Sequence, residues 1–201
     1  MRRMLLFCED SFHEAFLVSL VRRYEREHGI PVDLKPYSAR GGLPKMHHEL
    51  GEFLRDLHSD RQELPDRILV TVDANCQSYN ARRQEMASVV TTYQQFEYLV
   101  VYAIPDPHIE RWMLADPQAF RTVFGRGCTL PSLSCAKGEY KRLLREEIRQ
   151  SGVDAPLGGE EFAQDIVGAM NLSSVEVREP SLGKLLGDLR AVFHRWRGTQ
   201  I

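Results

Sequence analysis

Acidic side chains follow three separate apolar runs in this chain, an arrangement that suits metal-assisted chemistry. Glu9 comes directly after the run at residues 4–8, Asp73 comes directly after the run at 68–72, and Glu110 follows the run at 98–104. If these runs are parallel strands, their carboxyl ends meet at one edge of a sheet, where ligands usually bind. Carboxylates that converge there repel one another unless a cation fills the cluster. The pattern therefore predicts a divalent-metal site that acts on phosphate esters.

Other polar residues could complete this site. Asn75 can ligate a metal through its carbonyl oxygen or form a turn, and Glu110 can be an accessory ligand or a solvated helix acid. Lys137 could neutralise the charge of a phosphoryl transition state, or it belongs to an exposed basic face of the helix that follows. We expect Glu9 to be a ligand or general base and Asp73 to be the central ligand.

The elements that must position these residues alternate between strand and helix up to about residue 116. Apolar runs and alternation predict strands at 4–8, 32–37, 68–72 and 99–104. Helical spacing predicts a helix that Ser11 caps and Gly29 ends, then helices at 46–58, 82–93 and 109–114. After Gly125 only helices are expected, at 138–150, 160–170 and 181–197. We predict an α/β domain with a Rossmann-like, mostly parallel sheet at residues 1–124, and a helical extension at 125–201 packed on it.

Composition limits the classes of protein that the chain can belong to. With 201 residues, 43% of them hydrophobic, and a net charge of −2, it is neither disordered nor a polycation. Contact with nucleic acid would need a local basic patch or metal-bridged phosphates. No apolar stretch approaches the ~20 residues of a membrane span, so we expect a cytoplasmic protein with no membrane contact. The four cysteines form no C-x-x-C pair and are expected to be isolated reduced thiols.

Three segments resemble the motifs of TOPRIM domains. Residues 6–17, LFCEDSFHEAFL, are similar to the first motif, and residues 70–75, VTVDAN, are similar to the second. The most specific match is residues 104–116, IPDPHIERWMLAD, which resembles the Pro and Glu-x-Trp-Leu-Leu-x-Asp signature of a small bacterial TOPRIM-like family. Members of that family resemble the TOPRIM half of the overcoming-lysogenisation-defect nucleases. Residues 136–141 and 180–186 also resemble its later helices.

The resemblance implies a TOPRIM-like fold, and the acids that carry over unchanged are Glu9, Asp73 and Glu110. Asp10 replaces the family's glycine, His13 takes the place of the second glutamate of the first motif, and Asn75 replaces the second aspartate of the second. Fewer acids hold Mg²⁺ less tightly. An imidazole ligand at His13 suits Mn²⁺ better than Mg²⁺, so the expected cofactor is Mg²⁺ or Mn²⁺.

These features lead to one hypothesis and two rivals. The leading hypothesis is a metal-dependent nuclease that cuts DNA or RNA as the effector of a bacterial anti-phage or toxin system. The resemblance implies a partner ATPase of the ABC or SMC type encoded nearby, and the sequence also allows a homo-oligomer. The first rival is a non-catalytic TOPRIM-derived subunit that docks the ATPase or nucleic acid. The second is a nucleotidyl-transfer or ligand-sensing α/β domain. In each case Trp112 is expected to face the core.

Overall fold

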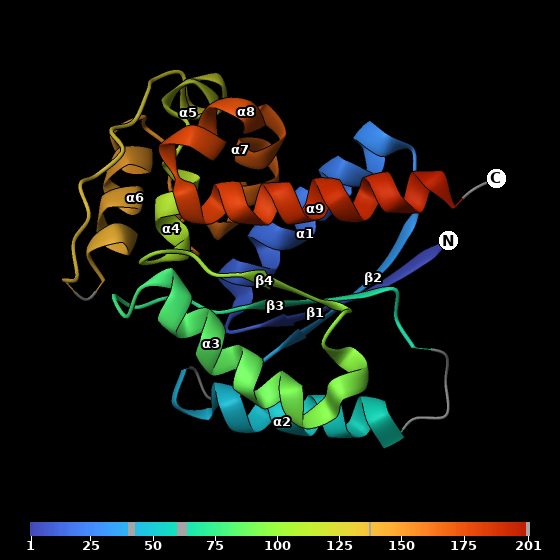
Figure 1. Ribbon diagram of the computed structural model, residues 1–201. Helices are drawn as coiled ribbons and strands as arrows, with labels where there is room; N and C mark the ends of the chain where they lie inside the picture. Colours follow the sequence, from blue (N-terminus) through green and yellow to red (C-terminus); the bar gives the residue numbers. More distant parts are fainter. Residues whose placement is uncertain (40–42, 60–63, 137, 200–201) are drawn as a thin grey trace.

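Four parallel strands form the centre of the molecule in the part of the chain that the structure describes. The structure is a computed structural model that describes residues 1–39, 43–59, 64–136 and 138–199. The strands lie in the order β2-β1-β3-β4 (Figure 1). Their bounds are Arg2–Cys8 for β1, Val32–Ser38 for β2, Arg67–Thr71 for β3 and Val100–Ala103 for β4. The predicted α/β class with a parallel sheet is confirmed, and each strand overlaps its expected range.

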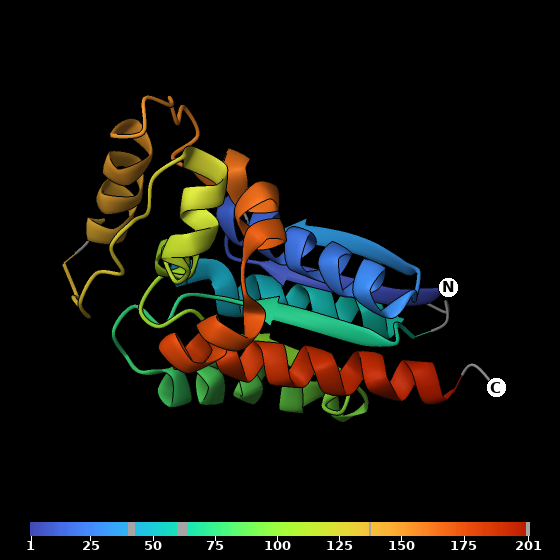
Figure 2. The ribbon, with the colours of Figure 1, turned by 90° about the horizontal axis from the view of Figure 1, so that it is seen from above.

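Helices cover both faces of this sheet. One face carries α1 (Ser11–His28) and the helices α7 (Ala163–Ala169) and α9 (Pro180–Gly198). The other face carries α2 (Leu43–Ser59), α3 (Tyr79–Val90) and the short 3₁₀ helix η1 (Thr91–Phe96). Figure 1 shows the sheet between these two layers, and Figure 2 looks down on the molecule from the side of α1 and α9. The start of β1 and the end of α9 lie at the end of the molecule opposite the carboxyl ends of the strands.

The alternation of side chains along each strand explains this layering. Successive side chains of a strand point to opposite faces of the sheet. Leu6 and Leu69 accordingly belong to the core under α1 and α9, whereas Phe7 and Val70 belong to the core under α2 and α3. All four are buried, as expected for a parallel sheet covered on both faces.

The remaining helices lie beyond the carboxyl ends of the strands or along α9. They are α4 (Ile109–Met113), α5 (Pro117–Phe124), α6 (Glu139–Arg149), η2 (Glu160–Phe162) and α8 (Leu172–Arg178). The sequence analysis did not predict α5 or α8, which are short. Phe16 of α1 and Leu186 of α9 lie in one hydrophobic core, so α9 packs on the α/β part through that core.

Trp112 confirms the structural role expected for it. The side chain is fully buried, and its Nε1 donates a hydrogen bond of 2.8 Å to Oγ of Ser181. Its ring lies 5.5 Å from the ring of Phe16. Trp112 therefore joins α4 to α1 and to the start of α9, on the side of the sheet that α1 covers.

The cysteines overturn one expectation. Cys76 and Cys135 form a disulfide with a Cα–Cα distance of 5.8 Å, whereas Cys8 and Cys128 are free and buried. Spacing alone gave no sign of the link, because it joins two loops that are 59 positions apart in sequence and meet only in the fold. None of the described helices is long and apolar enough to cross a membrane.

Candidate metal centre

The candidate site lies at the point where the winding of the sheet reverses. From β1 the chain passes through α1 to β2 on one side, and it later returns to β3 on the other side of β1. The loops that follow β1 and β3 therefore diverge from each other at this edge, which is where open α/β sheets usually bind ligands. Glu9 and Asp73 follow these two strands, so the predicted convergence of the first two acidic segments is confirmed.

Backbone hydrogen bonds extend this edge beyond β3 and β4. The N–H of Ala74 donates to the carbonyl of Pro105 at 2.8 Å, and the N–H of Asn75 donates to the carbonyl of Pro107 at 3.1 Å. These bonds hold the loop after Asp73 beside the loop that leads into α4. The third acidic segment is thereby brought to the same edge as the first two.

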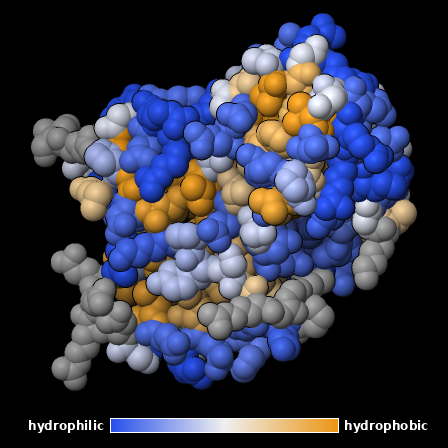
Figure 3. Space-filling view, turned by 180° about the vertical axis from the view of Figure 1, so that it is seen from behind, coloured by the Kyte–Doolittle hydropathy of each residue, from blue (hydrophilic) through white to orange (hydrophobic). Residues whose placement is uncertain are grey.

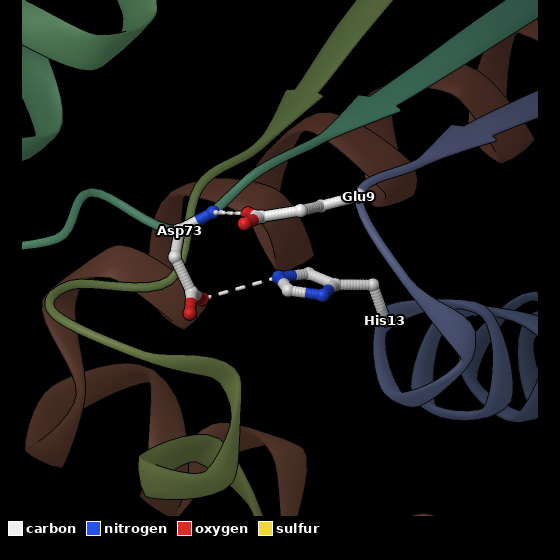
Figure 4. A group of neighbouring side chains, drawn as sticks. All are labelled: Glu9, His13 and Asp73. Atoms are coloured by element: carbon white, nitrogen blue, oxygen red, sulfur yellow. Dashed lines mark hydrogen bonds and ion pairs between the residues drawn. The ribbon is translucent and has the colours of Figure 1, made fainter. Parts of the chain in front are cut away.

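Three side chains converge closely enough to share one metal ion. One ligand atom from each of Glu9, His13 and Asp73 lies within 4.8 Å of the other two (Figure 4). The backbone N–H of Asp73 donates to Oε2 of Glu9 at 3.0 Å, and Nε2 of His13 donates to Oδ1 of Asp73 at 3.1 Å. Glu9 comes from the end of β1, His13 from the first turn of α1, and Asp73 from the end of β3.

Asp10 fixes the position of His13. It is the N-cap of α1, with Oδ1 accepting the backbone N–H of His13 at 3.0 Å, so the predicted cap at Ser11 is wrong by one residue. The same carboxylate accepts a 2.7 Å hydrogen bond from Nδ1 of His13. A carboxylate on the far nitrogen of a histidine is the usual support for a metal-ligating imidazole. Asp10, which replaces the glycine of the TOPRIM motif, thus orients His13, which replaces the second glutamate of that motif.

The structure adds His108, which the sequence analysis missed. Nδ1 of His108 donates to Oδ2 of Asp73 at 2.7 Å, and the backbone N–H of Ile109 donates to Oδ1 of Asp73 at 2.9 Å. Among the described residues, no hydrogen-bond partner is found for Nε2 of His108. The only sequence signal was its place, between Pro107 and Glu110 in the most specific of the three motifs.

Two imidazoles stabilise the negative charge of the central acid, Asp73. Burial opposes a charge on His13, but the charge of Asp73 and hydrogen bonds to Asp10 and Asp73 raise its pKa well above its ordinary value. The hydrogen bond to Asp73 raises the pKa of His108 as well. The pKa of Asp73 is lowered despite its burial, chiefly by the charge of His13. Burial opposes ionisation of Asp10, but the hydrogen bonds from His13 and the charge of that ring together lower its pKa to about 2. The expected repulsion between acids persists at Glu9 and Glu110, where burial and then the charge of Asp73 raise the pKa values, whereas the two imidazoles offset it at Asp73 itself.

The pKa values of the other two acids, Glu9 and Glu110, are raised rather than lowered. Burial raises the pKa of Glu9, and burial together with the charge of Asp73 raises the pKa of Glu110. Glu110, in the first turn of α4, thus shares the edge with Asp73 but is outside the group of three ligands. When fully ionised, the four acids Glu9, Asp10, Asp73 and Glu110 face the imidazolium rings of His13 and His108. A metal ion bound to His13 would displace its proton, so four acids would then face one imidazolium and leave three negative charges, of which a divalent ion would balance two.

The two remaining predicted site residues have different outcomes. Asn75 has a left-handed backbone with φ of 48°, and its hydrogen bond to Pro107 is made by its backbone, so the structure supports its turn role. Cys76 and Ser78 also have positive φ, at 64° and 73°, which makes this an unusually tight loop for residues that are not glycine. Lys137 lies outside the described residues.

Comparisons with known proteins leave the family open. No family model, no curated protein and no solved structure matches this chain. The TOPRIM relationship therefore remains a prediction from the sequence motifs, and functional argument must rest on the geometry of the site.

Proposed function

We propose that this protein is a divalent-metal-dependent phosphodiesterase of the TOPRIM type that hydrolyses nucleic acid. The observation that supports the proposal most strongly is the set of ligand atoms of Glu9, His13 and Asp73, within 4.8 Å of one another at the carboxyl edge of the sheet. Two carboxylates and one imidazole form a donor set that binds Mn²⁺ well and Mg²⁺ less tightly. When bound, such an ion would polarise a phosphoryl oxygen and acidify a water molecule.

The chain's own residues fit the remaining tasks of hydrolysis. In that reaction a water oxygen forms a bond to phosphorus, the bond from phosphorus to the sugar oxygen breaks, and the departing oxygen must gain a proton. His108 is suited to moving that proton, because Asp73 holds its Nδ1 and leaves Nε2 for exchange with substrate. Glu110 is suited to accepting the proton of the attacking water, because burial and the charge of Asp73 raise its affinity for protons.

One observation favours the rival of a non-catalytic binding subunit. The carboxylate of Asp73 already receives three hydrogen bonds, from His13, His108 and the backbone of Ile109. The imidazolium of His13 thus supplies between Asp10 and Asp73 the positive charge that a metal would otherwise bring. A site that is satisfied without metal could serve only to hold the loops in place for a partner, such as the ATPase that the resemblance implies.

Cleavage assays with the purified chain distinguish the two. Labelled single-stranded DNA, duplex DNA and RNA are incubated with Mn²⁺, with Mg²⁺ or with chelator. We expect Mn²⁺-dependent cleavage by the wild type and none by Asp73→Ala. Asp56→Asn, an exposed acid on α2, is the matched control and should cleave like the wild type.

The assay is repeated in the presence of the ATPase encoded nearby, where one is found. Cleavage that does not depend on metal, or that survives in Asp73→Ala, would exclude the proposed mechanism. Absence of cleavage under all conditions, together with unchanged partner binding by Asp73→Ala, would favour the non-catalytic subunit.

A further inference from the structure

Helix α6 carries a line of exposed cations. Lys141, Arg145 and Arg149 recur every four residues and are all exposed. Because a helix rises 1.5 Å per residue, consecutive cations of this line are about 6 Å apart along the axis. The stripe of α6 about 100° around the helix from these cations anchors it in the molecule through three buried residues, namely Tyr140, Leu144 and Ile148. The cations are therefore presented by a helix that is packed on the body of the protein.

These cations line an open groove, which we call the α6 groove. It encloses about 930 Å³ between α6 and the loop at residues 153–156. Lys141 and Arg145 also pack against Gly158, since a Cβ atom there would lie 3.4 Å from Cε of Lys141 and 3.3 Å from Nε of Arg145. These two side chains thus contact the chain just after the loop that forms the other side of the groove.

The groove has an excess of positive charge. It is lined by four cations, of which Arg142 pairs with the lining residue Glu146 at 2.9 Å. Asp154 is the other lining acid. Within the described residues, no carboxylate lies at ion-pair distance from the three cations of the line defined above. Figure 3 shows the edge of the molecule that carries α6 as strongly hydrophilic.

One end of the groove lies next to the candidate metal centre. Tyr140 begins the buried side of α6, and its ring lies 5.8 Å from the ring of His108. The disulfide between Cys76 and Cys135 ties the loop after Asp73 to the segment that precedes α6. Figures 1 and 2 both place α6 beyond the carboxyl ends of the strands. The line of cations therefore starts beside the site at Lys141 and leads away from it toward Arg149.

We propose that the α6 groove binds the phosphodiester backbone of single-stranded nucleic acid and leads the strand to the metal centre. A single line of regularly spaced cations matches one backbone, whereas a duplex presents two. Among the described residues, the rest of the lining is mainly aliphatic side chains and proline, and none of it is aromatic. Because no ring is present on which bases could stack, we expect binding through phosphates without base preference. Only the delivery of the bound strand to the metal centre for cleavage rests on the proposed function. Binding of the backbone by the groove itself needs no metal.

Binding is measured with the full chain in chelator, using fluorescence anisotropy of labelled single-stranded DNA, single-stranded RNA and duplex DNA. The test variant is K141E/R145E/R149E. The matched control is R26E/R178E/R195E, which reverses three exposed arginines on other helices and has the same net charge. We expect the test variant to lose at least about tenfold in affinity for single strands and the control to stay close to the wild type, since phosphate contacts dominate such binding.

A milder variant, in which the cations are neutralised rather than reversed, controls for misfolding. K141Q/R145Q/R149Q should keep the wild-type melting temperature and reduce the slope of log affinity against log salt by about 2, at ~0.7 per lost phosphate contact. Equal losses of affinity in the test and control variants would overturn the proposal, as would an absence of binding by the wild type. Tighter binding of duplex than of single strands, or competition by polyglutamate as strong as that by unlabelled single-stranded DNA, would also overturn it. Because this binding is measured in chelator, without a metal ion, failure of the proposed function would leave the result unaffected.

Discussion

At the scale of single residues, Asp73 is the centre of a chain in which acids and imidazoles alternate. Asp10 holds His13, His13 donates to Asp73, and His108 donates to the other oxygen of Asp73. This alternation lets a buried carboxylate keep its negative charge without a metal ion. It also means that a metal ion must compete with the proton that His13 carries.

The first prediction concerns Asp10. Asp10→Asn should weaken Mn²⁺ binding about 10- to 100-fold, because the carboxylate that orients His13 and increases its basicity is lost. Isothermal titration calorimetry at a fixed pH measures the affinity, with Asp56→Asn as the exposed control. An unchanged affinity for Mn²⁺ in Asp10→Asn would show that His13 is not a ligand.

The second prediction concerns pH in the absence of metal. The pKa values of His13 and His108 are raised in the folded protein above the ~6.5 of the unfolded chain. Their contribution to stability is therefore complete below about pH 6.5 and is lost as pH rises through the folded values. In chelator, the free energy of unfolding should fall between about pH 6.5 and pH 8.

Denaturant unfolding at several pH values tests this, and His13→Gln should flatten the trend because it removes the more deeply buried of the two titrating rings. The range stops near pH 8 because the buried thiols of Cys8 and Cys128, whose pKa values burial raises, add their own dependence above it. Identical slopes in the wild type and His13→Gln would refute the assignment of the proton to His13.

The site residues that sequence reasoning found and missed differ in a physical way. Glu9 and Asp73 were predictable because a buried parallel strand ends one residue before Glu9 and another ends two residues before Asp73. His108 was not, because an irregular segment between Pro107 and Ile109 has no periodicity that would show where its side chains point. The role of Asp10 was hidden because capping and histidine orientation both depend on the fold of one turn.

At the scale of elements, the disulfide connects the loop after Asp73 with the segment that precedes α6. Cys76 is one residue from the turn formed by Asn75, and Cys135 lies shortly before the first turn of α6. The link thus limits the motion of the α6 groove relative to the metal centre. It also explains how an exposed segment with little regular structure is held near the site.

The third prediction follows from that link. Cys76→Ser should lower the free energy of unfolding by about 2–4 kcal/mol under oxidising conditions, because a bridge across 59 positions restricts the unfolded chain. Cys128→Ser, at a free buried cysteine, is the control for loss of a thiol. Thiol titration of the denatured protein without reductant should find two free thiols in the wild type. Four free thiols, with no effect of reductant on stability, would show that the bridge does not form.

Elements with strong periodicity were predictable and short capped ones were not. The long helices α1 and α9 have apolar positions at helical spacing over many turns. The missed helices α5 and α8 have eight and seven residues, and each depends on one capping side chain, Asp116 and Asn171. Such caps also occur in turns, so they do not by themselves distinguish a short helix from a loop.

At the scale of the whole molecule, the residues that stabilise the fold are separate from the residues of the candidate site. Two hydrophobic layers, one under α1 and α9 and one under α2 and α3, enclose the sheet. The carboxyl edge of the sheet carries the acids and imidazoles, and the cations of α6 lie beside that edge. A chain with a net charge of −2 can thus carry a local excess of positive charge in the α6 groove without being a polycation.

The most direct test of the metal centre is diffraction from crystals grown or soaked with Mn²⁺. The fourth prediction is an anomalous difference peak at the carboxyl edge of β1 and β3, about 2.0–2.6 Å from an oxygen of Glu9, a ring nitrogen of His13 and an oxygen of Asp73. Crystals of Asp73→Asn should show no peak there. A Mn²⁺ peak elsewhere, or none in the wild type at millimolar Mn²⁺ and neutral pH, would contradict the assignment of this cluster as a metal centre.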